Sequence, residues 1–340
     1  AFEAGVGGPQ PRMSHLRSPG LRFPPGYLTL YPWDPKRYSR GLSDRGHKPL
    51  GGKIPDWSVR DRSEEAEMID TILVATDGSE GGSTAEKAGV FLAARLRVRL
   101  LGITVVEDGD VQAPSDAGLT LPPFPEAELG AYFRARSQGL ASRFSERARA
   151  EGLEATCDIG RGRADDRIVE KAQDTGLLVI GRDGCPANQS RALIGSNTES
   201  VIRKLSKSVL VAPSGSSLTG PIVLGFDGSP GSRIAASTAI ELSNSLGEPI
   251  HVFVDSKDKG RAIARFEEVR ELLAGVQQPI RETSSTLGRP DVKLVDTASE
   301  VRAGMIVMGA YGRNRITDYF LGSNAAAVVR TTPVPVLLAR

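Results

Sequence analysis

The eight residues ILVATDGS at positions 72–79 return as IVLGFDGS at positions 222–229. Two further blocks return in the same order: VIGRDG at 179–184 as VMGAYG at 307–312, and IGSN at 194–197 as LGSN at 321–324. Three short blocks recurring in one order indicate two copies of one fold. Each block places glycine or a small polar residue after an apolar run, which is where an open α/β sheet binds its ligand.

Between these blocks, apolar runs alternate with stretches of helical period. The run at 70–76 is apolar and β-branched without a breaker, which predicts a strand buried on both faces. In the following stretch, 82–96, the apolar residues form a single helical stripe. Such alternation predicts βαβ units with right-handed crossovers and helices on both faces. We therefore predict an α/β fold of two tandem doubly wound domains, each with a five-stranded, mostly parallel sheet.

Composition sets the expected domain boundaries. Residues 1–67 are rich in glycine and proline and show no sustained period, so we expect a disordered or loosely docked N-terminal tail. An alternative interpretation is a mis-annotated start, with the protein beginning at Met68, directly before the first predicted strand. The first domain is expected at 68–213, a linker at 214–218 and the second domain at 219–340.

Charge and cysteine content exclude several classes of partner. A formal net charge of +2 predicts neither nucleic acid nor an acidic membrane surface as a partner. No apolar run approaches the roughly 20 residues needed to span a bilayer. Two cysteines in 340 residues provide no disulfide framework, and we expect inert thiols in a cytoplasmic protein.

The second copy carries the stronger indication of a binding site. Gly309 and Gly312 follow a predicted strand, and Gly322 and Ser323 open a predicted helix. Glycines let backbone N–H groups approach a phosphate, and a helix start adds unpaired donors and the positive end of its dipole. These residues predict a cradle for a di- or triphosphate. Spacing alone leaves open the alternative that the glycines only shape a turn and Ser323 only caps a helix.

An acidic residue lies beside this predicted cradle. Asp227 ends the first strand of the second copy, next to the fourth strand in the expected sheet order. A carboxylate at the mouth of a phosphate pocket suits a magnesium ion or a ribose hydroxyl. Asp-Gly-Ser is also a common turn or helix cap, which remains the alternative interpretation.

These motifs resemble those of the universal stress proteins with two tandem domains, and the resemblance covers 70–213 and 219–340. In the ATP-binding members of that family the signature is Gly, two residues, Gly, nine residues, Gly, then Ser or Thr. Gly309, Gly312, Gly322 and Ser323 have this spacing, and Asp227 matches the acidic residue of the family.

The resemblance implies an adenine-nucleotide alpha-hydrolase-like fold with ATP across the carboxyl ends of the first and fourth strands. It places the adenine against backbone at the end of the second strand, at Phe253 or Val254. Asn324, beside Ser323, joins the expected site, and Mg²⁺ would be held through Asp227.

The first copy departs from this pattern. Its matching residues are Asp77, Gly181, Gly184, Gly195 and Ser196. Ten residues instead of nine separate its last two glycines, and an extra residue either bulges or misplaces the N–H groups. The second copy has a departure of its own, because Phe226 stands where the first copy has Thr76. An inward-pointing ring there would crowd the pocket.

The resemblance implies a nucleotide-responsive binding module in stress response, with ATP bound in the second domain. Two alternatives stay open: a slow ATPase or adenylyl-transfer enzyme of the same fold, and an interaction scaffold that binds no nucleotide. We assign no catalytic residue, because the three histidines form neither a Ser-His-Asp set nor a zinc spacing. The resemblance also implies pairing of the last strands, 208–212 and 334–339, within one chain or between the chains of a homodimer.

Overall fold

The first domain alternates strands and helices in the predicted order. The computed structural model describes residues 28–30, 69–107, 126–184, 194–310 and 321–340. The elements of the first domain are β2 (Thr71–Ala75), α1 (Glu80–Leu96), β3 (Arg99–Val106), α2 (Glu126–Ala150), β4 (Ala155–Arg161), α3 (Ala164–Ala172), β5 (Leu177–Gly181), α4 (Ser196–Lys204) and β6 (Ser208–Ala212). Its strands lie in the order β6-β5-β2-β3-β4, and all neighbours are parallel.

The second domain repeats this arrangement. Its elements are β7 (Ile222–Gly225), α5 (Pro230–Leu246), β8 (Ile250–Asp255), α6 (Lys259–Leu272), a 3-10 turn (Leu273–Gly275), β9 (Ile280–Ser285), α7 (Pro290–Glu300), β10 (Met305–Gly309), α8 (Ser323–Thr331) and β11 (Val336–Ala339). The strand order β11-β10-β7-β8-β9 is that of the first domain, again with parallel neighbours. The prediction of two doubly wound five-stranded domains is therefore confirmed.

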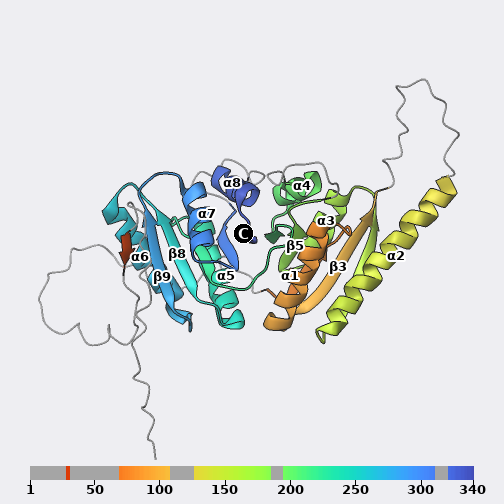
Figure 1. The fold of residues 1–340 in the computed structure, drawn as a ribbon, viewed down its shortest axis with the longest axis horizontal. Helices are drawn as coiled ribbons and strands as arrows, with labels where there is room; N and C mark the ends of the chain where they lie inside the picture. The colour runs from red at the N-terminus through yellow and green to blue at the C-terminus, as the bar shows by residue number, and fades with distance from the viewer. Residues whose placement is uncertain (1–27, 31–68, 108–125, 185–193, 311–320) are drawn as a thin grey trace, which may run out of the picture.

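The two half-sheets meet at their last strands. β6 and β11 pair antiparallel, with Val211 opposite Val336 and Val209 opposite Leu338. Because each of these strands also pairs with its own domain on the other side, the described strands form one continuous sheet. Figure 1 shows the domains on either side of this junction, with α4 and α8 above it.

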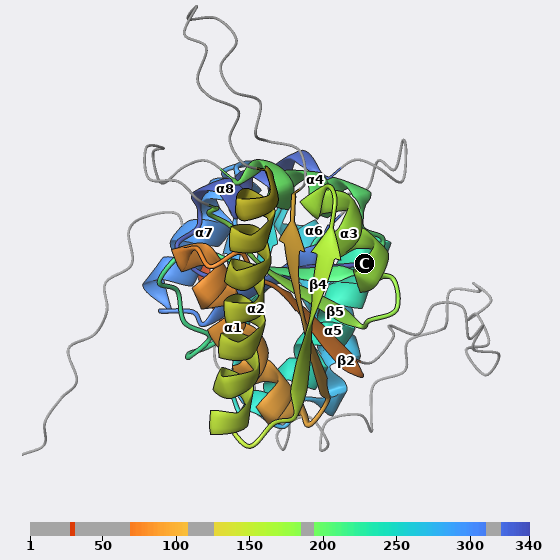
Figure 2. The same ribbon diagram turned by 90° about the vertical axis from the view of Figure 1, so that its right-hand side faces the viewer.

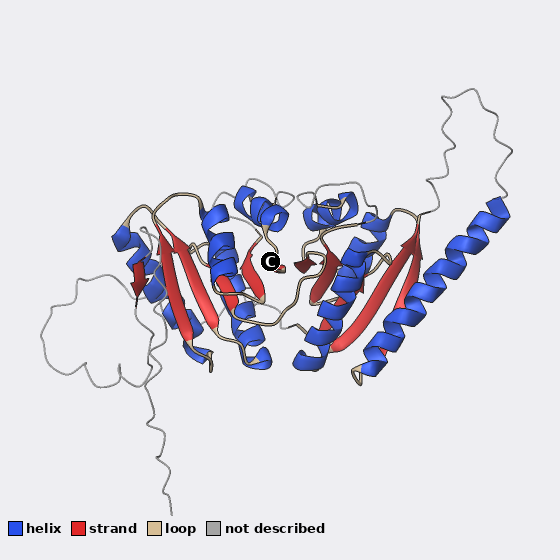
Figure 3. Ribbon diagram, viewed as in Figure 1, coloured by secondary structure: helices blue, strands red, loops and turns tan. Residues whose placement is uncertain are grey.

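Two hydrophobic cores lie on opposite faces of the sheet. On β2, for example, Ile72 and Val74 face one core and Leu73 and Ala75 face the other, as the two-residue period of a strand requires. The first core lies under α1, α2, α5 and α6, and the second lies under α3, α4, α7 and α8. Figure 2 shows α2 and α3 on opposite sides of the sheet, and Figure 3 shows the strands enclosed between helices.

The repeated Asp-Gly-Ser sequence builds the turn that leads into the first helix of each domain. In the second domain the glycine, Gly228, has φ +75°, a left-handed conformation that glycine adopts without strain. The carboxylate of Asp227 accepts from the Ser229 amide at 2.9 Å, and the Ser229 hydroxyl accepts from the Ser232 amide as the N-cap of α5. The first domain has the same turn and cap. The motif therefore fixes where an acidic side chain stands at the end of the first strand.

A short strand from the N-terminal segment lies at the outer edge of the second domain. β1 (Leu28–Leu30) pairs antiparallel with β9, with Leu28 opposite Ser284 and Leu30 opposite Glu282. Sequence analysis predicted no strand in this segment. The pairing satisfies backbone groups that an edge strand otherwise leaves unpaired. The other residues of the predicted tail lie outside the described part of the chain.

Candidate functional site

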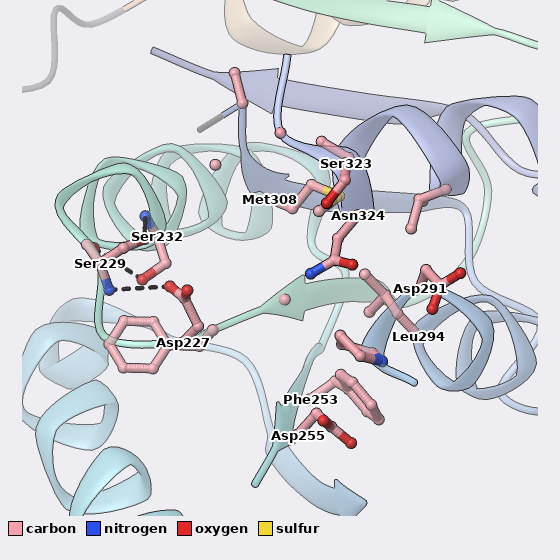
Figure 4. Close-up of a pocket in the computed structure, with 18 of the residues that line it drawn as sticks. Asp227, Ser229, Ser232, Phe253, Asp255, Asp291, Leu294, Met308, Ser323 and Asn324 are labelled. Carbon is pink, nitrogen blue, oxygen red and sulfur yellow. Dashed lines mark hydrogen bonds between the residues drawn. The ribbon is translucent and has the colours of Figure 1, made fainter. Parts of the chain in front are cut away.

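A cavity of about 490 Å³ lies at the carboxyl ends of β7, β8 and β10 in the second domain. Its lining includes Asp227, Phe253, Asp291, Gly309, Ser323 and Asn324. In Figure 4 the carboxylate of Asp227 and the amide of Asn324 lie on facing sides of this space. Of the residues predicted for this site, six therefore line one cavity: Asp227, Phe253, Gly309, Gly322, Ser323 and Asn324. Gly312 lies outside the described residues.

The helix that borders this cavity begins without a side-chain cap. Gly322 is the N-cap of α8, and because glycine has no side chain it provides no side-chain capping hydrogen bond to the first turn. Its amide donates to the Ala310 carbonyl at 3.0 Å, which joins the start of α8 to the end of β10. The first amides of a helix have no acceptor within the helix, and together with the dipole they attract an anion. α5, by contrast, is capped by Ser229. The start of α8 therefore offers N–H donors to a ligand.

Gly309 has a packing reason to be glycine. A Cβ atom at this position would lie 2.6 Å from the carbonyl carbon of Gly231 in α5. The end of β10 therefore approaches the first turn of α5 too closely for any side chain. In the first domain a Cβ on Gly181 would lie 2.5 Å from the carbonyl carbon of Gly81. These two glycines are explained by strand–helix packing, so they alone do not indicate a phosphate.

Of the two residues that the sequence named at the end of β8, Phe253 lines the cavity and the Val254 side chain faces a core. Val254 is fully buried in the core on the α5 and α6 side of the sheet and is not among the residues that line the cavity. Phe253 and Asp255 line it instead, because alternate side chains of a strand point to opposite faces. One carboxylate oxygen of Asp255 is buried without a hydrogen-bond partner among the described residues. This oxygen is an acceptor beside the cavity.

Phe226 does not behave as the sequence suggested. Its side chain is 2% exposed and belongs to the core under α5 and α6, which also contains Ala236 and Phe266. Although Phe226 borders the cavity, the space beside it remains about 490 Å³. The phenylalanine that stands in the second domain where the first has Thr76 therefore adds to a core and does not fill the cavity.

The first domain has a smaller cavity at the equivalent place. It measures about 160 Å³ and is lined by all five residues that sequence analysis named for it: Asp77, Gly181, Gly184, Gly195 and Ser196. Val105 lines it where the second domain has Asp255. Asp183 also lines it, within the loop that the repeat equates with the phosphate cradle. Burial alone would raise the pKa of Asp183, but hydrogen bonds from Arg182 and Ser214 lower it. The cavity of the first domain is therefore smaller, and the Asp183 carboxylate in its loop is ion-paired with Arg182.

A salt bridge at the start of α3 is a further difference between the first domain and the second. The Asp165 carboxylate accepts from Lys204 Nζ and from the Ser200 hydroxyl of α4, each at 2.6 Å. Burial opposes ionisation here, but hydrogen bonds from Arg163, Lys204 and Ser200 lower the pKa of Asp165.

The corresponding acid in the second domain is left facing its cavity. Asp291 is the counterpart of Asp165, and α8 has Ala327 and Thr331 where α4 has the serine and the lysine. Ala327 has no polar side-chain atom, and the Thr331 hydroxyl donates to the Ala327 carbonyl at 2.9 Å. Asp291 instead forms an ion pair with Arg289 at 3.6 Å and lines the larger cavity.

Three charged lining residues, Asp255, Arg265 and Asp291, were missed by sequence reasoning. Asp255 directly follows the run that predicts the second strand, and Asp291 follows the Gly-Arg-Pro turn, so position alone could have found both. Arg265 comes from α6, where it is 9% exposed and donates to the Asp255 carbonyl at 2.8 Å. Its place at the cavity depends on how α6 packs, and no local pattern marks it.

The cavity residues do not form a preformed metal centre. No group of three or more His, Cys, Asp or Glu side chains among the described residues could hold a metal ion. His251 is buried in β8, where its Nε2 contacts the Thr283 hydroxyl at 2.7 Å. Burial, with a smaller effect of Arg281, lowers the pKa of His251 to about 4, so it stays neutral near pH 7. In the described part of the chain, no helix is long and apolar enough to cross a membrane.

Comparison with known proteins gives a consistent answer for both domains. The model of the universal stress protein family matches residues 68–213 and 219–340. Universal stress protein Rv2005c of Mycobacterium tuberculosis is 26% identical over 295 residues, which cover 79% of this chain and 96% of the relative. A universal stress protein of Thermus aquaticus is 36% identical over 112 residues, covering 32% of this chain and 79% of the relative.

A solved structure shares the overall fold. The universal stress protein from Archaeoglobus fulgidus superposes with a TM-score of 0.64 at 19% identity, over 80% of this chain and 99% of that one. The two matched segments coincide with the two domains described above. The chain belongs to the universal stress protein family, with two of its domains in tandem.

Proposed function

We propose that the chain binds ATP in the cavity of the second domain and acts as a nucleotide-responsive module. Members of the universal stress protein family bind adenine nucleotides. The observation that carries the proposal is the uncapped start of α8, which faces a cavity shared with Asp227 and Asn324. The N–H groups of the first turn would receive the phosphates, with the Ser323 hydroxyl as a further donor.

Cavity volume favours the second domain over the first. Small-molecule sites in proteins typically measure about 300–1,000 Å³. The cavity of about 490 Å³ lies within this range, and that of about 160 Å³ lies below it. We therefore propose one nucleotide per chain, with the first domain empty under the same conditions.

Two further carboxylates line the cavity besides Asp227. Asp255 and Asp291 would repel phosphate and attract the hydroxyl or amino groups of a ligand. The unpartnered oxygen of Asp255 would accept a hydrogen bond from the ribose or the adenine amino group. Mg²⁺ would arrive with the triphosphate and take Asp227 as its protein ligand, because magnesium in nucleotide sites relies on one or two carboxylates plus phosphates.

We also propose that the pairing of β6 with β11 replaces a homodimer through these strands. Both strands are paired on both edges within one chain. A second copy would have to displace one of these pairings, so the last strands would not serve as the interface of a dimer.

One pair of substitutions tests the site. Ser323→Asp places a negative charge at the first residue of α8, where it opposes phosphate binding but favours the helix dipole. Ser196→Asp makes the matched change at the first residue of α4. By titration calorimetry, we expect S323D to weaken ATP binding by at least about tenfold and S196D to leave it unchanged.

Adenosine serves as a second ligand in the same experiment, because it lacks the phosphates. Its affinity should change less than that of ATP in S323D. An absence of ATP binding to the unmodified protein would overturn the proposal. Loss of binding in S196D but not in S323D would move the site to the first domain.

A further inference from the structure

Arg182 connects the first domain to a helix of the second. It directly follows β5, and its side chain is buried, with 8% exposed. Its Nη1 donates to the carbonyl oxygen of Thr332 at 2.7 Å. A buried, charge-assisted hydrogen bond of this length is among the stronger polar contacts in a protein. The contact crosses the junction between the domains.

Thr332 is the C-cap of α8, the helix whose first residue borders the larger cavity. α8 contains nine residues, so its two ends lie only about 14 Å apart. A cation at the C-terminal end complements the helix dipole, and it also satisfies one of the carbonyls that a helix end leaves unpaired. Arg182 thus holds one end of a short rigid helix whose other end faces the proposed nucleotide site.

The guanidinium is held in place from its own domain. Its Nε donates to Asp183 Oδ1 at 2.9 Å, and Asp183 Oδ2 accepts from the Ser214 amide at 2.9 Å. The backbone carbonyl of Arg182 accepts from the Gly195 amide at 2.8 Å, at the start of α4. One residue therefore contacts the beginning of α4 through its backbone and the end of α8 through its side chain.

The junction has a second arginine that makes the reciprocal contact. The Arg340 side chain donates to the Ile202 carbonyl in the last turn of α4. In the second domain the position equivalent to Arg182 is Ala310, which is fully buried. Each domain therefore contacts a helix end of the other, and of these two arginines Arg182 is the one that contacts the helix of the larger cavity.

We infer that Arg182 is a positioning residue for the nucleotide site of the second domain, acting across the domain junction on the C-terminal end of α8. This inference rests on the function proposed above. The hydrogen bond fixes the axis of α8, so that the Ser323 and Asn324 end keeps its direction toward the cavity. The loop that would cradle phosphate in the first domain instead supports the site of the second.

The test compares Arg182→Ala, Arg182→Lys and Arg340→Ala with the unmodified full chain. ATP affinity is measured by titration calorimetry, and stability by urea unfolding without nucleotide. R182A should weaken ATP binding by at least about fivefold, the lower end of typical couplings between sites. R182K keeps a cation and a donor near Thr332 and should recover most of the affinity. R340A removes a comparable contact at α4, so it should lower stability but leave ATP affinity unchanged.

The possible results distinguish failure of the positioning role of Arg182 from failure of ATP binding itself. If the unmodified chain binds no ATP, the proposed function fails. If it binds ATP and R182A binds equally well, the positioning role fails. Equal weakening in R182A and R340A would also overturn it, because a general loosening of the junction would then explain both.

Discussion

The hydroxyl of Thr76 donates to the Glu86 carboxylate at 2.5 Å inside the core of the first domain. Glu86 is fully buried and forms ion pairs with Arg143 at 2.5 Å and Arg147 at 2.9 Å, both from α2. In the second domain Phe226 and Ala236 occupy the positions of the threonine and the glutamate. One copy therefore joins its first strand and helix by a polar cluster, and the other joins them by apolar packing.

Removing Glu86 should destabilise the protein strongly. In Glu86→Ala the two arginines lose their counter-charge at the edge of a core. Breaking a buried pair costs about 3–5 kcal/mol, and the partial exposure of both arginines places the expected loss at the lower end. Urea unfolding measures it. Glu199→Ala removes the exposed pair with Arg203 and should change stability by less than about 1 kcal/mol. Similar losses in the two variants would contradict this account.

The repeat was sufficient to predict the architecture. Apolar runs such as 70–76 and 177–181 correspond to strands, and the duplicated Asp-Gly-Ser corresponds to the same capped turn in both domains. These features depend on residues near one another in the sequence. Local periodicity and turn chemistry carry that information.

The shape of the site could not be predicted in the same way. Whether Phe226 fills the cavity or the core depends on the space left by Ala236 and by α6, which is a matter of tertiary packing. The tie between Asp165 and Lys204 joins residues 39 apart in the sequence. At the end of β8 the sequence left Phe253 and Val254 as alternatives, because a shift of one residue reverses the face of a strand, and the side chain of Phe253 is the one that lines the cavity.

Gly181, the last residue of β5, and Gly184, in the loop that follows it, should respond differently to alanine. In Gly181→Ala the new methyl group would lie 2.5 Å from the Gly81 carbonyl carbon, so α1 must move. Overpacking of this kind typically costs about 1–3 kcal/mol. In Gly184→Ala the methyl group meets no atom of the described residues within 4 Å, and stability should stay within about 0.5 kcal/mol of the unmodified protein. Equal effects in urea unfolding would show that packing does not explain Gly181.

His251 should make stability fall in mild acid. Its pKa is lowered from 6.5 to about 4 in the folded protein, first by burial and then by Arg281. Between these values the unfolded chain binds a proton that the folded chain does not. The full stabilisation is therefore present above about pH 6.5, and up to about 3 kcal/mol is lost as the pH falls toward 4.

The variant His251→Gln isolates this effect, because glutamine does not titrate and can still hydrogen-bond Thr283. Unfolding free energies are measured by urea denaturation at about pH 7 and about pH 5. Over this interval the contribution of His251 to the free energy of unfolding should fall. The unmodified protein should lose more stability over this interval than the variant does. Parallel pH profiles would show that His251 carries no part of the acid sensitivity.

Cys157 should react slowly while the protein is folded. Burial, with smaller effects of Asp158 and Glu86, raises the pKa of its thiol from 9.0 to about 12. Because the thiolate is the reactive form, alkylation by iodoacetamide near pH 8 should be slower than for an ordinary cysteine by about two to three orders of magnitude. The experiment uses Cys185→Ser, so that only one thiol remains. Unfolding this variant in urea should restore the ordinary rate, since the carboxylates and the surrounding core then no longer oppose ionisation. A folded-state rate equal to the unfolded one would mean that the thiol is neither desolvated nor held near those charges.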